Sequence, residues 1–315
     1  MTDVKEAKKT DSFLKRLKKD IRINYSLYFL ILPVLAFYLY FHYKPMYGLL
    51  ISFQDFSVRK GIWGSEWTGF ENYIRFFNDP YFVRNIVNTF RISIASLVFG
   101  FPAPIILALL MNELTSNRYK KTVQTITYLP HFISLVVVCG MVTDYVASDG
   151  IITRLISSIT GKELEESLLN NASLFVPIYV ISDIWREVGW GSIIYLAALS
   201  GVDQELYEAA GIDGAGRLRQ VWSITIPSIL PTIITLLILR LGTLVSLGYE
   251  KIILLTNPYN AETSEILSYY IYKKGIDGGE YGLATAAGLF NSIINCVLVV
   301  VTNYISKRVN ETSLW

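Results

Sequence analysis

Long apolar runs alternate with polar segments along this chain. Five stretches contain no Asp, Glu, Lys or Arg at all, and each is close to or longer than the roughly 20 residues that cross the hydrocarbon core of a bilayer. They are residues 23–43, 92–112, 122–143, 220–239 and 281–306. This pattern predicts helices that span a membrane.

A sixth segment, residues 173–200, is apolar but carries Asp183, Arg186 and Glu187. Its apolar halves flank these charges closely, and the connections between the other runs require a further crossing, so we count it as a span. The chain is thus predicted to be all-α, a polytopic membrane protein with six transmembrane helices. The expected spans are residues 25–47, 88–111, 126–147, 173–200, 224–248 and 283–306.

The composition agrees with this assignment. Apolar residues make up 52% of the chain and the mean hydropathy is +0.40, whereas charged residues make up only 17%, below the roughly 25% of soluble proteins. No internal repeat or low-complexity linker divides the sequence. We therefore expect one membrane domain over residues 25–306, between a basic N-terminal segment (residues 1–24) and a short tail (residues 307–315).

The distribution of positive charge predicts the orientation of the chain. Cationic flanks are retained on the cytoplasmic side of a membrane, and residues 1–24 carry Lys5, Lys8, Lys9, Lys15, Arg16, Lys18, Lys19 and Arg22. Six crossings return the tail, with Lys307 and Arg308, to the same side. Both termini are thus expected in the cytoplasm. Residues 4–22 fit either a helix on the membrane lipid or a solvated tail.

Neither cysteines nor histidines suggest a metal or redox site. Cys139 and Cys296 both fall within predicted spans, where a small buried apolar role is expected. His42 and His131 lie near span ends and far apart in sequence, so we expect packing rather than ligation. We predict no cofactor or metal bound by this chain.

Several polar residues lie at membrane depth, where they are costly and face a cavity or a partner. They are Asp183, Arg186, Glu187, Arg240, Asn291 and Asn295. One interpretation is a polar lining for a substrate path. The other is structural: an intramembrane ion pair, such as Arg240 with Asp183, and hydrogen bonds between helices. The sequence leaves both open.

The break between the fourth and fifth spans has a distinct chemistry. Asp203 is a good N-cap for a short helix, and the small side chains of Ala209 and Ala210 would let another backbone approach closely. Gly211 is the expected helix stop, and Asp213 the expected cap of a second short helix. Pro227 suits the first turn of the span that follows.

This break resembles the coupling loop of ABC importer permeases. The resemblance rests on Glu208-Ala209-Ala210, on Gly211 three residues after the glutamate, and on Ile224-x-x-Pro227. It implies that residues 203–222 sit in a groove of an ATP-hydrolysing subunit. The residues implied in that contact are Glu208, Ala209, Ala210, Gly211, Asp213, Gly214 and Ala215.

Further segments resemble the permeases of bacterial polysaccharide and pectin-fragment importers. They include Trp185 to Trp190, Gly69 to Tyr73 and Tyr281 to Phe290, and they add Trp185 and Trp190 to the candidate substrate path. The resemblance implies a type I importer fold, a second homologous permease, two ATPase subunits and an extracellular solute-binding protein that delivers an oligosaccharide. ATP and magnesium would belong to the ATPases, since this chain has no Gly-x-x-x-x-Gly-Lys-Ser/Thr motif.

Other functions fit the sequence less well. A stand-alone secondary sugar transporter or channel is possible with six spans, but inverted halves are not visible. A membrane enzyme acting on polysaccharide lacks paired carboxylates. A DNA-reading helix pair at residues 203–222 fails because Arg217 and Arg219 alone make a poor phosphate-binding surface, so no nucleic acid partner is expected.

Overall fold

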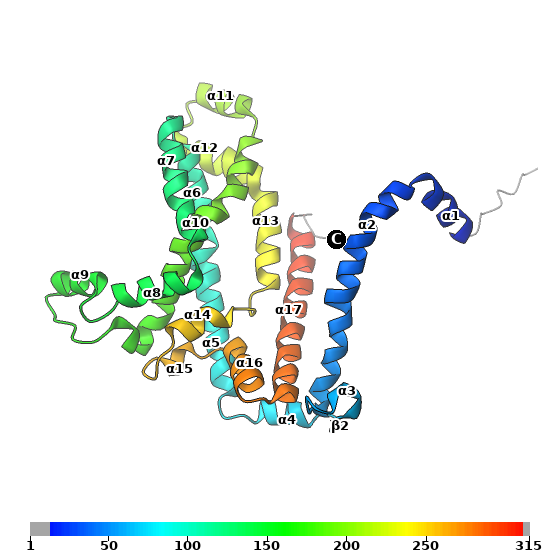
Figure 1. Ribbon diagram of the computed structural model, residues 1–315. Coiled ribbons are helices and arrows are strands. Elements are labelled where there is room, and N and C mark those ends of the chain that lie inside the picture. Colours follow the sequence, from blue (N-terminus) through cyan, green and yellow to red (C-terminus); the bar gives the residue numbers. More distant parts are fainter. Residues whose placement is uncertain (1–12, 311–315) are drawn as a thin grey trace, which may run out of the picture.

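The described part of the protein is almost entirely helical (Figure 1). The structure, a computed structural model, describes the backbone of residues 13–310 and the side chains of residues 18–307. The predicted N-terminal segment is therefore described only from α1 (Phe13–Ile23) onward, and residues 311–315 of the tail lie outside the described part. One short antiparallel pair, β1 (Gln54–Asp55) with β2 (Glu66–Trp67), is the sheet found within that range.

The first long helix stands apart from the rest of the chain (Figure 1). It comprises α2 (Tyr25–Tyr38), a π-helical turn (Leu39–Tyr43) and a 3-10 segment (Lys44–Phe53). None of the side chains in α2 is buried by the rest of the chain. The helix packs against α17 (Tyr281–Asn310) mainly through its last segment, so most of its apolar surface is free to contact lipid or another subunit.

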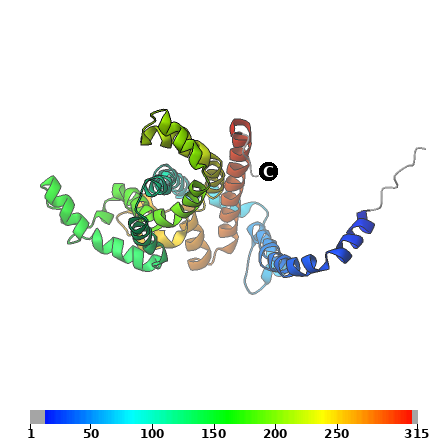
Figure 2. The same cartoon turned by 90° about the horizontal axis from the view of Figure 1, so that it is seen from above.

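The remaining long helices form a bundle. One runs through α5 (Phe82–Ala95), a π turn (Ser96–Gly100) and α6 (Pro102–Asn112). A second is α10 (Phe175–Ser200). A third runs through α12 (Arg217–Gln220), a π turn (Val221–Thr225) and α13 (Ile226–Gly242). Together with α17 and the short helix α7 (Asn117–Tyr128), they lie side by side in both views (Figures 1 and 2).

Within residues 13–310, four helices are long and apolar enough to cross a membrane, and counting the bent pair of α7 (Asn117–Tyr128) and α8 (Leu135–Tyr145) as one span would make five. These four are residues 25–53, 82–112, 217–242 and 281–307, which confirms the location of four predicted spans with shifted ends. The fourth predicted span corresponds to α10. This helix is long, but it carries three charged residues and is therefore not among these four. The number six remains a prediction.

The prediction of one helix over residues 126–147 is wrong. Here α7 passes into a 3-10 turn (Leu129–Phe132), the chain becomes extended at Ile133, and α8 (Leu135–Tyr145) leaves at 101°. Ser134 causes the new start, because its hydroxyl accepts a hydrogen bond from the backbone N–H of Val137 at 3.4 Å. A hydropathy profile does not detect this break, because a capping serine carries no charge.

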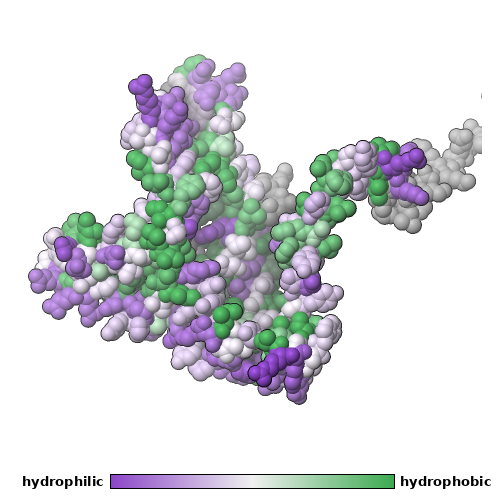
Figure 3. All heavy atoms as spheres, viewed as in Figure 1, coloured by the Kyte–Doolittle hydropathy of each residue, from purple (hydrophilic) through white to green (hydrophobic). Residues whose placement is uncertain are grey.

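Short elements gather at the end of the bundle opposite α11 (Gln204–Ile212) (Figure 1). They are α3 (Gly61–Gly64), α4 (Glu71–Phe77), α14 (Tyr249–Leu255), α15 (Ala261–Ser264), α16 (Leu267–Tyr272) and the turns Leu168–Asn170, Ala172–Leu174 and Lys273–Asp277. The helix α9 (Ile151–Thr160) projects sideways with α8. Polar residues cover both ends of the visible face and apolar residues gather between them (Figure 3), as expected for a molecule that crosses a bilayer.

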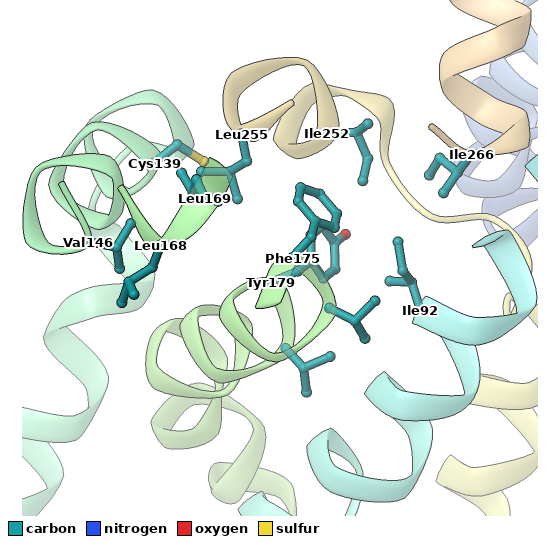
Figure 4. Close-up of a cluster of buried hydrophobic side chains, with 12 residues drawn as sticks. Ile92, Cys139, Val146, Leu168, Leu169, Phe175, Tyr179, Ile252, Leu255 and Ile266 are labelled. Atoms are coloured by element: carbon teal, nitrogen blue, oxygen red, sulfur yellow. The ribbon is translucent and has the colours of Figure 1, made fainter. Parts of the chain in front are cut away.

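The largest buried cluster joins α5, α8, α10 and α14 (Figure 4). Ile92, Phe175 and Ile252 are fully buried there, and Cys139 packs beside them. Cys139 is buried, as expected, whereas Cys296 is exposed on the surface of this chain, so the expectation of a buried role is wrong for Cys296. A smaller cluster of Ala108, Tyr195, Leu199, Val202 and Ile229 lies nearer α11, so each end of the bundle has its own core.

Candidate functional site

The segment that resembles a coupling loop forms an exposed helix at one tip of the molecule (Figure 1). The predicted N-cap is confirmed, because an Oδ1 atom of Asp203 accepts a hydrogen bond from the backbone N–H of Glu205 at 3.0 Å. Glu208, Ala209 and Gly211 are exposed. This helix thus presents a small-residue surface to which another protein has access.

The end of this helix differs from the prediction at two residues. The helix continues past Gly211 to Ile212, and Gly214, with φ +73°, takes the left-handed position instead. The backbone N–H of Ala215 bonds to the Ala210 carbonyl at 2.9 Å, and that of Gly214 to the Gly211 carbonyl at 3.0 Å. This is the double hydrogen-bond pattern of a Schellman C-cap, for which the glycine at the left-handed position matters most.

Asp213 does not cap the second short helix. Gly216 precedes α12, and no side chain caps its first turn. The Gln220 side chain instead closes the turn by donating from Nε2 to the Ala215 carbonyl at 3.0 Å. The connection between the two helices is therefore held by backbone geometry and one amide.

Tyr207 links the exposed helix to the bundle. Its hydroxyl lies 2.9 Å from the hydroxyl of Thr225, in the π-helical turn that leads into α13. The Tyr207 ring packs against the buried cluster that contains Tyr195 and Ile229. Sequence reasoning missed this residue, although its side chain is the one aromatic ring in α11, which was a usable signal.

A polar cavity of about 460 Å³ lies between α6, α10 and α13. Its lining includes Asp183, Glu187, Trp190 and Arg240, four of the candidate path residues. A second cavity of about 190 Å³ continues from it and shares Asp183 and Arg240. The structure therefore brings these four predicted residues together around one polar space.

The predicted ion pair between Arg240 and Asp183 is wrong. Asp183 pairs instead with Lys251 of α14, at 3.3 Å. Lys251 is only 5% exposed, and its Nζ also donates to the Tyr179 carbonyl at 2.9 Å. Arg240 takes part in none of the ion pairs formed among residues 18–307. At this cavity the Asp183 carboxylate is thus anchored, while the Arg240 guanidinium has no ion-pair partner within the described residues.

Glu187 is held by two neighbours. One oxygen lies 3.0 Å from Arg186 Nη1, and the other lies 2.9 Å from His131 Nδ1. The His131 ring stacks on Trp190 with centroids 4.5 Å apart, in agreement with the expectation that this histidine has a packing role. These contacts fix one face of Trp190, while Arg186 itself does not line the cavity.

The other candidate residues lie elsewhere. Asn295 accepts a hydrogen bond from the Val245 backbone at 3.2 Å and donates to the Ser246 hydroxyl at 2.7 Å, so it secures the chain after α13. Asn291 has a buried Oδ1 without a hydrogen-bond partner and does not line the polar cavity. Trp185 borders a separate, apolar cavity.

Comparison with known proteins places this architecture in a family. Residues 83–311 match the family described as "Binding-protein-dependent transport system inner membrane component". The chain is 45% identical to Protein LplB of Bacillus subtilis (strain 168) over 305 residues, covering 96% of this chain and 94% of that protein. It is 43% identical to the polygalacturonan/rhamnogalacturonan transport system permease protein YteP of the same strain, over 302 residues, 96% and 94% of the two chains.

A solved structure agrees at the level of the fold. The crystal structure of a bacterial alginate ABC transporter, in complex with an alginate pentasaccharide-bound periplasmic protein, superposes with a TM-score of 0.86. The two chains are 42% identical, and the match covers 95% of this chain and 100% of the other. The family assignment that the coupling-loop resemblance suggested is confirmed: this chain belongs to the binding-protein-dependent transport system inner membrane components, and is a multi-pass permease of the inner membrane rather than a catalytic subunit.

Proposed function

We propose that this chain is one of two permease subunits of an ATP-driven importer of acidic oligosaccharides, such as pectin or alginate fragments. The main support is the near full-length similarity to YteP and to the alginate transporter, both of which are named for acidic polysaccharides. The unpaired Arg240 in the polar cavity supports this substrate class, since a guanidinium binds a sugar carboxylate through two parallel hydrogen bonds. Asp183, Glu187 and Trp190 complete the proposed path.

The proposed topology has six spans in a type I importer fold. Four are the long apolar helices, the fifth is the bent pair of α7 and α8, and the sixth is α10. At about 1.5 Å per residue, its 26 residues reach roughly 39 Å, enough for a hydrocarbon core of about 30 Å. Its charges do not oppose this, because Asp183 and Glu187 face the interior cavity and each has a cationic or histidine partner. In this topology residues 1–24 and 307–315 are cytoplasmic and flank the membrane domain at residues 25–306.

The segment 203–222 is the proposed contact with an ATPase. Glu208 would form a polar contact, Ala209 and Ala210 would permit close packing, and the turn from Gly211 through Asp213 and Gly214 to Ala215 would hold the helix at its angle. The exposure of this helix supports the role. ATP and magnesium would bind to the two ATPase subunits, so this permease would contribute movement and no catalysis.

A second permease and a binding protein complete the proposed assembly. The long apolar face of α2, which this chain does not cover, is suited to a homologous subunit and to lipid. The opposite end of the molecule from α11 would receive the loaded solute-binding protein.

The test is ATP-driven uptake by the complete transporter in proteoliposomes, with pectic and alginate oligosaccharides compared against neutral ones of equal length. Ala210→Arg, which places a large cation on the small-residue surface, should abolish uptake and ATPase binding while the chain still inserts in the membrane. Normal uptake by this variant would remove the coupling assignment. If this chain alone moved sugar along an ion gradient, it would act as a secondary transporter instead.

A further inference from the structure

We infer that this permease holds the acyl chain of a phospholipid in a cavity between α8, α9 and α10. This inference goes beyond the proposed transport function and rests on it in one respect, the placement of the second permease beside α2. The cavity measures about 490 Å³, and its walls include Val142, Ile152, Ile156, Ile178 and Trp185. It is separate from the polar space around Arg240, with which it shares no lining residue.

The walls disfavour a polar ligand. Among the lining side chains, those with a polar atom are Tyr145, Ser182 and Trp185. The Ser182 hydroxyl is already satisfied, because it donates to the carbonyls of Ile178 at 2.7 Å and Tyr179 at 3.0 Å. The Tyr145 hydroxyl and the Trp185 indole N–H are too few to replace the hydration of a sugar, and a cavity with so few polar groups does not hold ordered water well. If the cavity were empty, the side chains that line it would lose the van der Waals contacts that a bound molecule provides.

The size fits a hydrocarbon chain. At about 30 Å³ for a group the size of a water molecule or a methylene, a volume of about 490 Å³ has room for roughly 16 such groups. That corresponds to a large part of one phospholipid acyl chain.

The helix α9 supplies the second, independent observation. Ile151, Leu155 and Ile159 are 69%, 60% and 77% exposed and recur every four residues, so they form one outward apolar stripe. Ile152 and Ile156 continue this apolar arc into the cavity, whereas Arg154 and Ser158 lie on the other side of the stripe. An apolar arc bordered by a cation is the pattern of a helix that lies in a membrane interface.

The position of α9 puts this stripe at the level of the bilayer. In Figure 1, α8 and α9 project sideways at a height between the two ends of α17, a helix long and apolar enough to cross a membrane. They project on the side opposite α2 in both views (Figures 1 and 2). Because the uncovered face of α2 is where a second permease would pack, the surface around α9 is left to lipid.

Two measurements on the complete transporter test the inference. In the first, the transporter is reconstituted in phosphatidylcholine vesicles with brominated acyl chains, and fluorescence quenching is compared between the wild type and Trp185→Phe. We expect the quenched component to shrink in the variant, because Trp185 borders the cavity. If the variant quenches as the wild type does, acyl chains do not reach Trp185, and the inference is overturned.

In the second, native mass spectrometry follows the phospholipid that survives mild detergent extraction. Ile152→Trp fills the cavity, and Ile151→Trp is its matched control, since Ile151 faces outward on the same helix. We expect loss of a retained phospholipid in the first variant and not in the second. Equal retention in both would overturn the inference. Assembly with the ATPases checks folding, and Ile156→Phe replaces Ile152→Trp if that variant does not assemble.

Discussion

Tyr207 is the residue through which movement of the exposed helix can reach a long helix of the bundle. Its hydroxyl meets Thr225, and Thr225 is 1% exposed in a π-helical turn. Such turns contain one residue more per hydrogen-bonded ring and frequently occur at functional sites. A contact between the helix tip and this turn would therefore let a push on α11 change the start of α13.

Tyr207→Phe tests this link by removing one hydroxyl and keeping the ring. The hydrogen bond contributes about 0.5–1.5 kcal/mol, so the variant should fold and assemble. We expect less sugar imported per ATP hydrolysed, measured in proteoliposomes by parallel uptake and phosphate release. Thr225→Val should give the same deficit, and the double variant should give no larger one. Tyr119→Phe, at a side chain that is 59% exposed, is the control. An unchanged ratio of sugar to ATP in both would contradict the link.

Gly189 allows α10 to lie directly against α7. A Cβ atom at this position would stand 2.0 Å from the Thr127 carbonyl oxygen, so even alanine must push the two backbones apart. Overpacking of this kind costs about 1–3 kcal/mol. We expect Gly189→Ala to lower the apparent melting temperature of the purified transporter, measured by scanning fluorimetry. Gly140→Ala is the matched control, because a Cβ there meets nothing within 4 Å; equal melting of the two variants would refute the close-packing argument.

Sequence reasoning at this scale succeeded where a residue acts on its own chain neighbours. Asp203 could be identified as a cap because its partner is two residues away. Lys251 could not be matched to Asp183, because the two are 68 residues apart and Lys251 lies in a segment expected outside the membrane. The pairing of Asp183 is decided by the fold, and the sequence offered Arg240 as an equally suitable cation.

At the scale of elements, the end of α11 is set by Gly214. Its φ of +73° is costly for any residue with a Cβ, by about 1–2 kcal/mol. We expect Gly214→Val to weaken the Schellman cap and to speed hydrogen exchange of the amides in residues 208–212. Gly211→Ala has the opposite expectation, because Gly211 lies within the helix and alanine there stabilises by about 0.5–1 kcal/mol. Exchange that is unchanged by the valine, or faster in the alanine variant, would show that the cap does not limit this helix.

The elements also show why four spans were located from sequence as single helices and the segment at residues 126–147 was not. Long charge-free runs identify helices such as residues 82–112 and 281–307, since hydropathy measures the property that a bilayer requires. The bend after Phe132 depends on a 3-10 turn and on the Ser134 cap, and neither changes the hydropathy. In the sequence, the bent pair of α7 and α8 therefore has the appearance of one straight helix.

At the scale of the whole molecule, ion pairs close the end opposite α11. Arg84 of α5 pairs with Glu265, which also lies 3.6 Å from Lys273. Arg75 of α4 pairs with Glu280, which lies 3.3 Å from Lys274. Arg84 and Glu265 are 181 residues apart, so these contacts join the first half of the chain to the last. Together with the contact between Tyr207 and Thr225 at the other end, these ion pairs hold the helices together at both ends of the molecule, and the polar cavity lies between the two ends.

Glu265 contributes most to the ion pairs at this end, because its side chain is only 18% exposed and it pairs with both Arg84 and Lys273. Glu265→Gln removes the negative charge and leaves the half-buried Arg84 unpaired, which costs more than the pair itself contributes. We expect a lower apparent melting temperature, and in the double variant with Arg84→Gln a partial recovery, since the less exposed of the two cations is then removed and Lys273, which also loses Glu265, is 58% exposed to solvent. Contacts of this kind couple by about 0.5–3 kcal/mol in double-mutant cycles. Additive losses in the two single variants would mean that the pair is screened by solvent, and that the buried cluster around Phe76 holds this end of the molecule instead.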